Sequence, residues 1–227
     1  LGYQQGGTTL LTASSTGFNT FAGFGAGTST TSGANNTFVG YQSGQANTTG
    51  NSNTANGYQS LFSNTTGTAN TANGVLSLYS NTTGTQNTAL GNLSLRLNTT
   101  GSYNTANGYQ SLYSNTTGSY NIGLGYNSGY NVTTGYDNIF LGHDENTGGT
   151  AITTGYNNIG LGYNIKFPAV SSSNMLNVGN FLFANLPATT TATTIGNTPL
   201  TGLLGVGTSS PYAKLTVWGQ GTGTGQA

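Results

Sequence analysis

The strongest constraint on this chain is an asparagine that recurs at every seventeenth position. The members of this register are Asn19, Asn36, Asn53, Asn70, Asn87, Asn104, Asn121 and Asn138. A further copy, Asn158, follows after a longer step, because an insertion around residues 145–151 lengthens one unit. Internal repeats of this length predict supersecondary units that stack on their neighbours instead of sharing one globular core.

Two glycines keep a fixed place in each unit. One lies four residues after the asparagine: Gly23, Gly40, Gly57, Gly74, Gly91, Gly108, Gly125, Gly142 and Gly162. The other lies three residues before it: Gly33, Gly50, Gly67, Gly84, Gly101, Gly118, Gly135 and Gly155. Glycine, asparagine and threonine are poor helix formers. We expect the second glycine, in Asn-Thr-Thr-Gly, to supply positive φ at a turn, and the first to mark a bulge or a close backbone approach.

The repeat predicts an all-β fold. A seventeen-residue unit suits two strands of about five residues each, joined by two turns. Stacked units give a parallel β-solenoid, which we place at residues 1–165 with about nine coils. At a strand spacing of roughly 4.8 Å, the rod would be about 40 Å long. A β-rich connector is expected at 166–201, and a junction hairpin with a tail at 202–227.

Stacking also predicts where side chains gather. Asparagines of successive coils can form an amide ladder, with Asn36, Asn53, Asn70, Asn87, Asn104, Asn121 and Asn138 as its members. Core candidates share one repeat position: Leu61, Leu78, Leu95 and Leu112. Along the later strands Ile122 and Leu124 alternate on one face, whereas Phe38 and Ala55 lie on the other face of theirs. One face can fill the coil and the other can meet a second subunit. Because a thin coil buries little apolar surface alone, we expect a homotrimer.

The composition of the chain argues against several classes of function. The charged side chains are Arg96, Lys166, Lys214, Asp137, Asp144 and Glu145, with zero net charge. About a quarter of a typical chain is charged, and phosphate binding needs a basic surface, so we expect no nucleic-acid partner. No apolar run approaches the roughly 20 residues that span a bilayer, so we expect no membrane insertion in this segment. The absence of cysteine excludes disulfides and thiolate metal sites. We expect no enzyme activity and no cofactor.

At this point the residues carry a family likeness. The fullest units read NTANGYQSLFSNTTGTA and NTANGYQSLYSNTTGSY. They resemble the head repeats of trimeric autotransporter adhesins and similar repeats of phage tail fibres. The segment GVGTSSPYAKLTVWG resembles a junction in tail-fibre-like and large bacterial surface fibre proteins. The resemblance implies a trimeric fibre outside the cell, on a cell surface or on a virion, although the adhesin repeat is usually shorter. Since the chain starts at Leu1, we expect a mature product or a fragment.

His143, Asp144 and Glu145 form the densest cluster of titratable residues. A carboxylate pair could serve glycoside hydrolysis, but adjacent residues on a strand point to opposite faces, which disfavours it. Three copies near a trimer axis could instead bind a metal ion. We favour a polar loop that opens the insertion.

Six asparagines begin an Asn-X-Thr sequon and are candidates for glycosylation: Asn47, Asn64, Asn81, Asn98, Asn115 and Asn131. Modified, they would form a row of sugars along the solenoid. The alternative, which we favour, is that Asn-Thr-Thr-Gly is turn chemistry.

Aromatic residues also keep repeat positions. Tyr41, Tyr58, Tyr109, Tyr126 and Tyr163 share one position, and Phe62, Tyr79, Tyr113 and Tyr130 share another. Stacked tyrosines beside amides can bind glycans of a cell or host surface. Packing between coils or subunits is the simpler interpretation, and we favour it.

Three functions therefore stand at this stage. The leading one is a non-enzymatic extracellular fibre or adhesin-like module, a spacer or a surface-attachment element. The alternative is a self-polymerising filament subunit, joined end to end or curli-like. A third is ice binding, since Thr48, Thr65, Thr82, Thr99 and Thr116 form a rank.

Overall fold

The computed structural model describes residues 2–5, 8–13, 17–143, 152–185, 204–206 and 215–217. All regular elements within these residues are strands. They are β1 (Gly2–Gln5), β2 (Thr8–Ala13), β3 (Thr20–Ala22), β4 (Thr37–Val39), β5 (Thr54–Asn56), β6 (Thr71–Asn73), β7 (Thr88–Leu90), β8 (Thr105–Asn107), β9 (Ile122–Leu124), β10 (Ile139–Leu141), β11 (Ile159–Leu161), β12 (Met175–Val178), β13 (Leu182–Asn185), β14 (Leu204–Val206) and β15 (Leu215–Val217).

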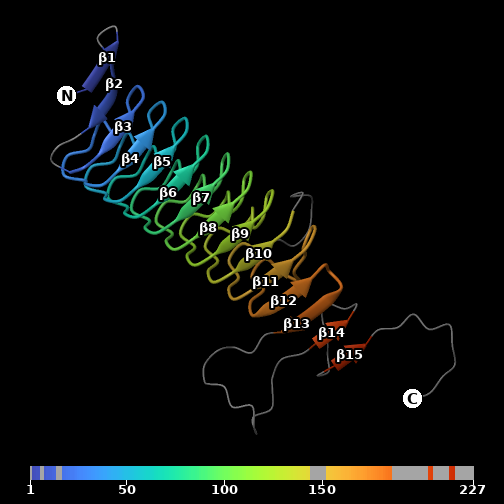
Figure 1. Cartoon of the computed structure of the whole chain (residues 1–227). Helices are drawn as coiled ribbons and strands as arrows, with labels where there is room; N and C mark the ends of the chain where they lie inside the picture. The colour runs from blue at the N-terminus through green and yellow to red at the C-terminus, as the bar shows by residue number, and fades with distance from the viewer. Residues whose placement is uncertain are drawn as a thin grey trace, which may run out of the picture.

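Strands β3 to β12 form a parallel β-solenoid. Each pairs in parallel with the next, and residues one repeat apart face each other, as Thr54 faces Thr71 and Ala55 faces Ala72. Figure 1 shows the strands stacked one behind another along a single axis. The same order holds across the insertion, where Ile139 pairs with Ile159 despite the longer step in sequence. The predicted all-β solenoid with seventeen-residue coils is confirmed.

The coil differs from the prediction in its strand content. Each coil has one strand of three residues rather than two of about five. In the rest of the coil, single backbone bonds join neighbouring coils, such as Leu61 N–H to the Ser77 carbonyl at 3.0 Å. The reason is backbone direction: in this coil φ is positive at Gln59, Leu61 and Ala69, at 51°, 50° and 55°. An extended strand cannot continue through such left-handed corners.

Both glycines allow close packing of neighbouring coils, but positive φ lies at the first glycine and not at the second. Gly57, four residues after Asn53, has a φ of 140°, and a Cβ there would lie 2.7 Å from the Gly74 carbonyl carbon. Gly67, in Asn-Thr-Thr-Gly, is not among the residues with positive φ. A side chain at Gly67 would instead collide with the carbonyl oxygen of Gly84 in the next coil. The prediction of positive φ at the second glycine was therefore wrong; that glycine is needed for close packing.

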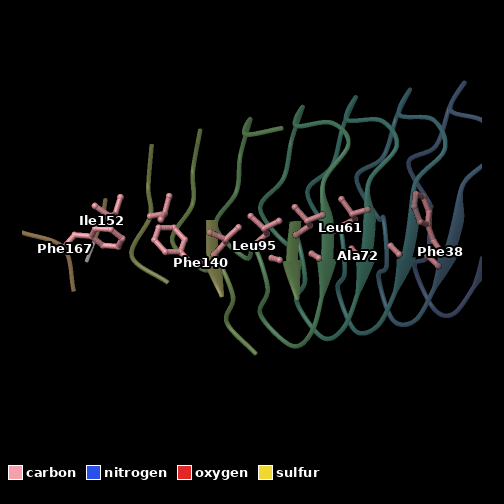
Figure 2. Packing of buried hydrophobic residues seen from close by; sticks show 14 of the residues in the cluster. Phe38, Leu61, Ala72, Leu95, Phe140, Ile152 and Phe167 are labelled. Carbon is pink, nitrogen blue, oxygen red and sulfur yellow. The ribbon is translucent and has the colours of Figure 1, made fainter. Parts of the chain in front are cut away.

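The interior of the coils is closed within one chain. Leu61, Leu78, Leu95 and Leu112 are fully buried. The strand residues Phe38 and Ala55 are buried as well, so their face, and not that of Ile122 and Leu124, fills the coil. Figure 2 shows buried core side chains, with Phe38, Leu61 and Leu95 among those labelled, in one row along the axis. Burial of the core thus needs no second subunit, contrary to the argument from thin coils.

Two pairs of residues fill the same interior space. Coils with alanine in the strand carry leucine six residues later, as in Ala55 and Leu61, whereas Phe38 is followed by Gly44. A Cβ on Gly44 would collide with the Phe38 ring. Phe38 also stacks on Phe21 of the preceding coil, with ring centroids 5.2 Å apart. The large side chain can therefore come from either position, but not from both.

The ends of the stack differ from the predicted boundaries. Strand β2 pairs antiparallel with β3, and β13 pairs antiparallel with β12. The parallel stack therefore runs from β3 to β12, within residues 20–178, compared with 1–165 in the prediction. Strands β14 and β15 fall in the expected junction but pair in parallel, so the predicted hairpin is corrected. Apolar runs around Ser-Ser-Pro indicate strands, but they do not fix strand direction.

Candidate functional site

A first amide ladder runs inside the solenoid from Asn19 to Asn158. At each step the side-chain oxygen of one asparagine accepts the backbone N–H of the next, as from Asn70 to Asn53 at 3.0 Å. The Asn70 amide also donates to Asn53 Oδ1 at 3.2 Å and to the Gly84 carbonyl at 2.8 Å. The ladder continues across the insertion, where Asn158 Nδ2 donates to Asn138 Oδ1 at 2.9 Å. The residues Asn36, Asn53, Asn70, Asn87, Asn104, Asn121 and Asn138 all lie in this column and are fully buried.

The sequon asparagines form a second ladder. Asn81 Nδ2 donates to Asn64 Oδ1 at 2.7 Å and to the Gly84 carbonyl at 3.0 Å. The same pattern links Asn98 to Asn81 and Asn115 to Asn98, at 2.7 and 2.8 Å. The members Asn47, Asn64, Asn81, Asn98 and Asn115 are fully buried. The glycosylation hypothesis is corrected for these five residues, because the amide nitrogen that would carry a sugar lies inside the coil and donates hydrogen bonds.

The second ladder stops at Asn115. One repeat later its position is taken by Val132, which is buried, and Ile152 follows at the corresponding place of the next coil. The Asn115 Oδ1 atom is buried without a hydrogen-bond partner. The last sequon asparagine, Asn131, lies one residue out of register and is only partly buried. The interior therefore changes from amide to aliphatic between Asn115 and Val132.

The threonine rank proposed for ice binding is already hydrogen-bonded. Thr65 Oγ1 donates to the Thr82 carbonyl of the next coil at 3.1 Å, and Thr82 Oγ1 to Thr99 at 3.0 Å. The same bond is made by Thr48, Thr99 and Thr116. Their hydroxyl protons are thus used within the protein rather than offered to ice.

The first aromatic column lies on the surface. The rings of Tyr41 and Tyr58 stack at 5.3 Å with an angle of 7° between their planes, and those of Tyr109 and Tyr126 at 5.2 Å with 18°. All four tyrosines are exposed. Because stacked rings cover much of each other's faces, ring edges and phenol groups are the parts most open to a glycan. Val75 and Asn92 interrupt the column between Tyr58 and Tyr109.

A second aromatic column contains Arg96. Arg96 lies between Tyr79 and Tyr113, with its guanidinium 5.6 and 5.8 Å from the ring centroids. It also donates to the Tyr113 hydroxyl at 3.0 Å. Tyr130 stacks on Tyr113 at 4.9 Å. Burial raises the pKa of Tyr130, and the neighbouring Tyr113 and Tyr109 phenols act in the same direction. Sequence reasoning missed the role of Arg96, although the coils before and after it carry Tyr79 and Tyr113 at the same repeat position.

His143 belongs to the first aromatic column. Its ring meets Tyr126 edge-on at 4.8 Å and Tyr163 at 5.3 Å. Its predicted partners Asp144 and Glu145 lie outside the described residues. Within the described ranges, no three His, Cys, Asp or Glu residues gather to hold a metal ion. What the structure shows of His143 is ring packing.

The outward face of the solenoid sheet has two distinct halves. On β3–β8 its first row consists of threonines: Thr20, Thr37, Thr54, Thr71, Thr88 and Thr105. On β9–β12 both rows are aliphatic: Ile122, Leu124, Ile139, Leu141, Ile159, Leu161, Leu176 and Val178. We call the second set the aliphatic face. Charged side chains are absent from both halves of this described surface.

Comparison with known proteins gave no relatives. The chain matches no protein-family model, no curated protein and no solved structure. In the part of the chain that the structure describes, no helix is long and apolar enough to cross a membrane.

Proposed function

We propose that this chain is a non-enzymatic structural module of an extracellular fibre, a stiff spacer or surface-attachment element that works as a homotrimer. The observation that carries the proposal is the unbroken parallel stack from β3 to β12. A solenoid transmits length and direction, because each coil is fixed to its neighbours by backbone bonds.

The interior supports a stiff rod. Successive coils are joined by backbone bonds and by buried side-chain ladders such as Asn70 to Asn53. The core residues Leu61, Leu78 and Leu95 fill the space between these ladders. Bending the rod would open hydrogen bonds on one side, and a buried amide without a partner costs about 1–3 kcal/mol.

The homotrimer and the extracellular location come from the resemblance of the repeat and of the junction to adhesin heads and tail fibres. The low charge and the exposed Tyr41, Tyr58, Tyr109 and Tyr126 support contact with glycans of a cell or host surface. Phenol groups and amides, such as that of Gln59 next to Tyr58, suit hydrogen bonding to sugar hydroxyls.

The test combines mass and shape in solution. Light scattering during gel filtration is expected to give three times the chain mass of 23.0 kDa. Small-angle X-ray scattering is expected to show a rod whose solenoid part measures about 43 Å, at roughly 4.8 Å per strand. A mass of one chain at every concentration would remove the trimer, and scattering from a flexible coil would contradict the spacer.

The filament alternative has a structural obstacle. End-to-end growth needs a free parallel edge at each end of the stack. Here β2 and β13 occupy these edges and run antiparallel to their neighbours. Negative-stain microscopy across a concentration series would reveal growing filaments if the ends were nevertheless adhesive.

A second candidate function is ordering of water or ice on the outer face of β4–β8. Thr54 and Thr71 face outward in register there, and their hydroxyls make no hydrogen bond within the described residues. Thr71→Lys is expected to abolish any inhibition of ice recrystallisation, whereas Thr83→Lys, at an exposed turn, is the matched control. An inactive wild-type protein would close this option.

A further inference from the structure

Arg96 is an unpaired cation on an otherwise neutral part of the molecule. It is the only charged side chain between residues 17 and 136. Asp137, the one carboxylate among the described residues, lies more than two coils further along the stack and at a different repeat position. Two coil spacings amount to about 10 Å, whereas an ion pair needs a separation of about 4 Å. The charge of Arg96 is therefore not neutralised by any described residue.

Most of the hydrogen-bonding capacity of Arg96 is unused. A guanidinium has five N–H donors. Within the described residues, Arg96 donates one hydrogen bond, from Nη1 to the Tyr113 hydroxyl at 3.0 Å, and its Nε is buried without a partner. Since Tyr113 accepts this bond, its own O–H proton remains free to donate. The outer nitrogens of the half-buried Arg96 can therefore offer donors to an oxygen-rich ligand, next to the Tyr113 hydroxyl.

The neighbouring rings hold the guanidinium in place. Its carbon lies 5.6 Å from the Tyr79 ring centroid and 5.8 Å from that of Tyr113, on the two sides of Arg96 along the column. Between coils without arginine, the same column continues ring on ring, as Phe62 and Tyr79 stack at 5.1 Å. Cation–π contacts attract the charge without neutralising it. A guanidinium fixed in this way loses less side-chain entropy when a ligand binds.

The chemistry of the site selects a carboxylate. A planar guanidinium pairs two N–H donors with the two oxygens of a carboxylate. A densely charged polymer such as a nucleic acid needs several cations in a row. The next described cation, Lys166, lies about four coils from Arg96, at roughly 4.8 Å a coil. One isolated negative charge within a neutral ligand therefore fits this surface best.

The residues around Arg96 point to a sugar as the carrier of that charge. Tyrosine offers apolar ring edges to the C–H groups of a sugar and a phenol group to its hydroxyls. Tyr79 and Tyr113 supply both on either side of the guanidinium. We propose that Arg96, together with Tyr79 and Tyr113, forms a binding site for a carboxylated sugar of an otherwise neutral glycan. This inference deepens the glycan contact of the proposed function and rests on it for the source of the ligand.

The single arginine gives the test a direct signal. Arg96 is the only arginine of the chain, so its Nε–H proton gives one side-chain signal in the nuclear magnetic resonance spectrum of the full-length protein. We expect methyl glucuronide to shift this signal in a saturable way. Methyl glucoside lacks only the carboxylate, and acetate lacks the sugar, so each is expected to bind about tenfold more weakly. Raising the ionic strength from about 0.01 to 0.15 M should weaken the binding of methyl glucuronide.

Three variants separate the charge from the shape of the site. Arg96→Tyr makes the column aromatic from Tyr79 to Tyr113 and removes the charge, so backbone amide signals should no longer distinguish methyl glucuronide from methyl glucoside. Arg96→Lys keeps the charge but loses the planar pair of donors, and is expected to bind methyl glucuronide more weakly than the wild-type protein. Lys166→Gln removes an exposed charge elsewhere and is expected to leave the binding unchanged.

The wild-type titrations can also overturn the inference, even if a variant fails to fold. An unchanged Arg96 signal would remove the site. Equal binding of methyl glucoside would exclude recognition of the carboxylate, and equal binding of acetate would exclude recognition of the sugar, so either result overturns the proposal. The mass and rod shape that test the proposed function do not depend on these titrations, so the two failures are distinguishable.

Discussion

The coils before and after residue 122 share a backbone but differ in what fills and covers them. From Asn47 to Asn115 the interior holds two amide ladders, beside alanine and leucine from Ala55 onward. From Val132 onward one ladder remains, and Val132, Ile152 and Phe167 occupy the interior. Because the strands stay in register throughout, the fold depends on corners and backbone bonds more than on the chemistry of the filling.

The outward face changes at the same place. On β3–β8 one row is threonine and the other mixes asparagine with Ala22, Val39 and Leu90, whereas on β9–β12 both rows are aliphatic. A threonine row is well hydrated, whereas exposure of Leu124 and Leu141 to water is unfavourable. The polar coils thus suit contact with solvent, and the aliphatic coils suit contact with another protein surface.

The largest expected effect tests whether the Phe38 and Gly44 pair can replace the Ala55 and Leu61 pair in the interior of a coil. Ala55→Phe places a ring against Leu61 and is expected to destabilise the protein by about 3 kcal/mol through overpacking. The added change Leu61→Gly reproduces the arrangement of Phe38 and Gly44 and should restore most of that loss. Urea unfolding followed by circular dichroism measures both variants. A double variant no more stable than Ala55→Phe would show that the two fillings are not interchangeable.

The next largest effect compares a residue in the middle of the second amide ladder, Asn81, with the residue at its end, Asn115. Asn81→Val leaves Asn64 Oδ1 without a donor, in addition to Asn115 Oδ1. Asn115→Val only moves the unpaired oxygen to Asn98. The same chemical change is therefore expected to be about 2 kcal/mol worse at Asn81 than at Asn115. Equal unfolding free energies for the two variants would mean that the ladder bonds do not act as described.

A smaller effect is expected at Arg96 in the amide-filled coils. Arg96→Ala removes two ring contacts and the bond to the Tyr113 hydroxyl, and should destabilise the chain by about 1 kcal/mol. Arg96→Tyr would continue the column from Tyr79 to Tyr113 and is expected to stay near wild-type stability. Thermal unfolding compares the two, and an Arg96→Tyr protein as weak as Arg96→Ala would exclude column stacking as the cause.

The smallest effect is a pH dependence near the aliphatic coils. The pKa of Tyr130 is raised above its ordinary value of 10.0 in the folded state, so the folded state holds this proton more tightly than the unfolded one. Its contribution is therefore constant below about pH 10 and is lost as the pH rises above that value. The urea concentration at the midpoint of unfolding, measured from about pH 8 to 11, should fall less steeply with pH in Tyr130→Phe than in the wild-type protein. Identical slopes would contradict the shift.

Periodic features of the fold could be predicted from sequence, because they follow from the spacing alone. The repeat of Asn53, Asn70 and Asn87 placed one residue type in each column, and Leu61 and its equivalents were expected in the core. Strand length could not be predicted this way, because it depends on left-handed corners at residues such as Leu61 and Ala69, whose types do not demand positive φ. The fixed spacing of the glycines did not show which of them has positive φ at a corner and which only allows close packing of two coils.

The candidate site was harder to predict for the same reason. A sequon such as Asn81-Thr82-Thr83 has the same letters whether its amide faces solvent or the interior. Only the path of the coil shows that Asn81 points inward. The role of Val132 also becomes visible only from the path of the coil, because Val132 ends a buried ladder that the sequence alone does not show.

A crystal structure that resolves side-chain amides tests the central claim most directly. We predict two interior columns of asparagine, with Asn81 bonded to Asn64 and Asn70 bonded to Asn53, and only one column after Val132. Asn70 or Asn81 facing solvent, or lying apart from the equivalent residues of neighbouring coils, would contradict the stacked solenoid and the function argued from it.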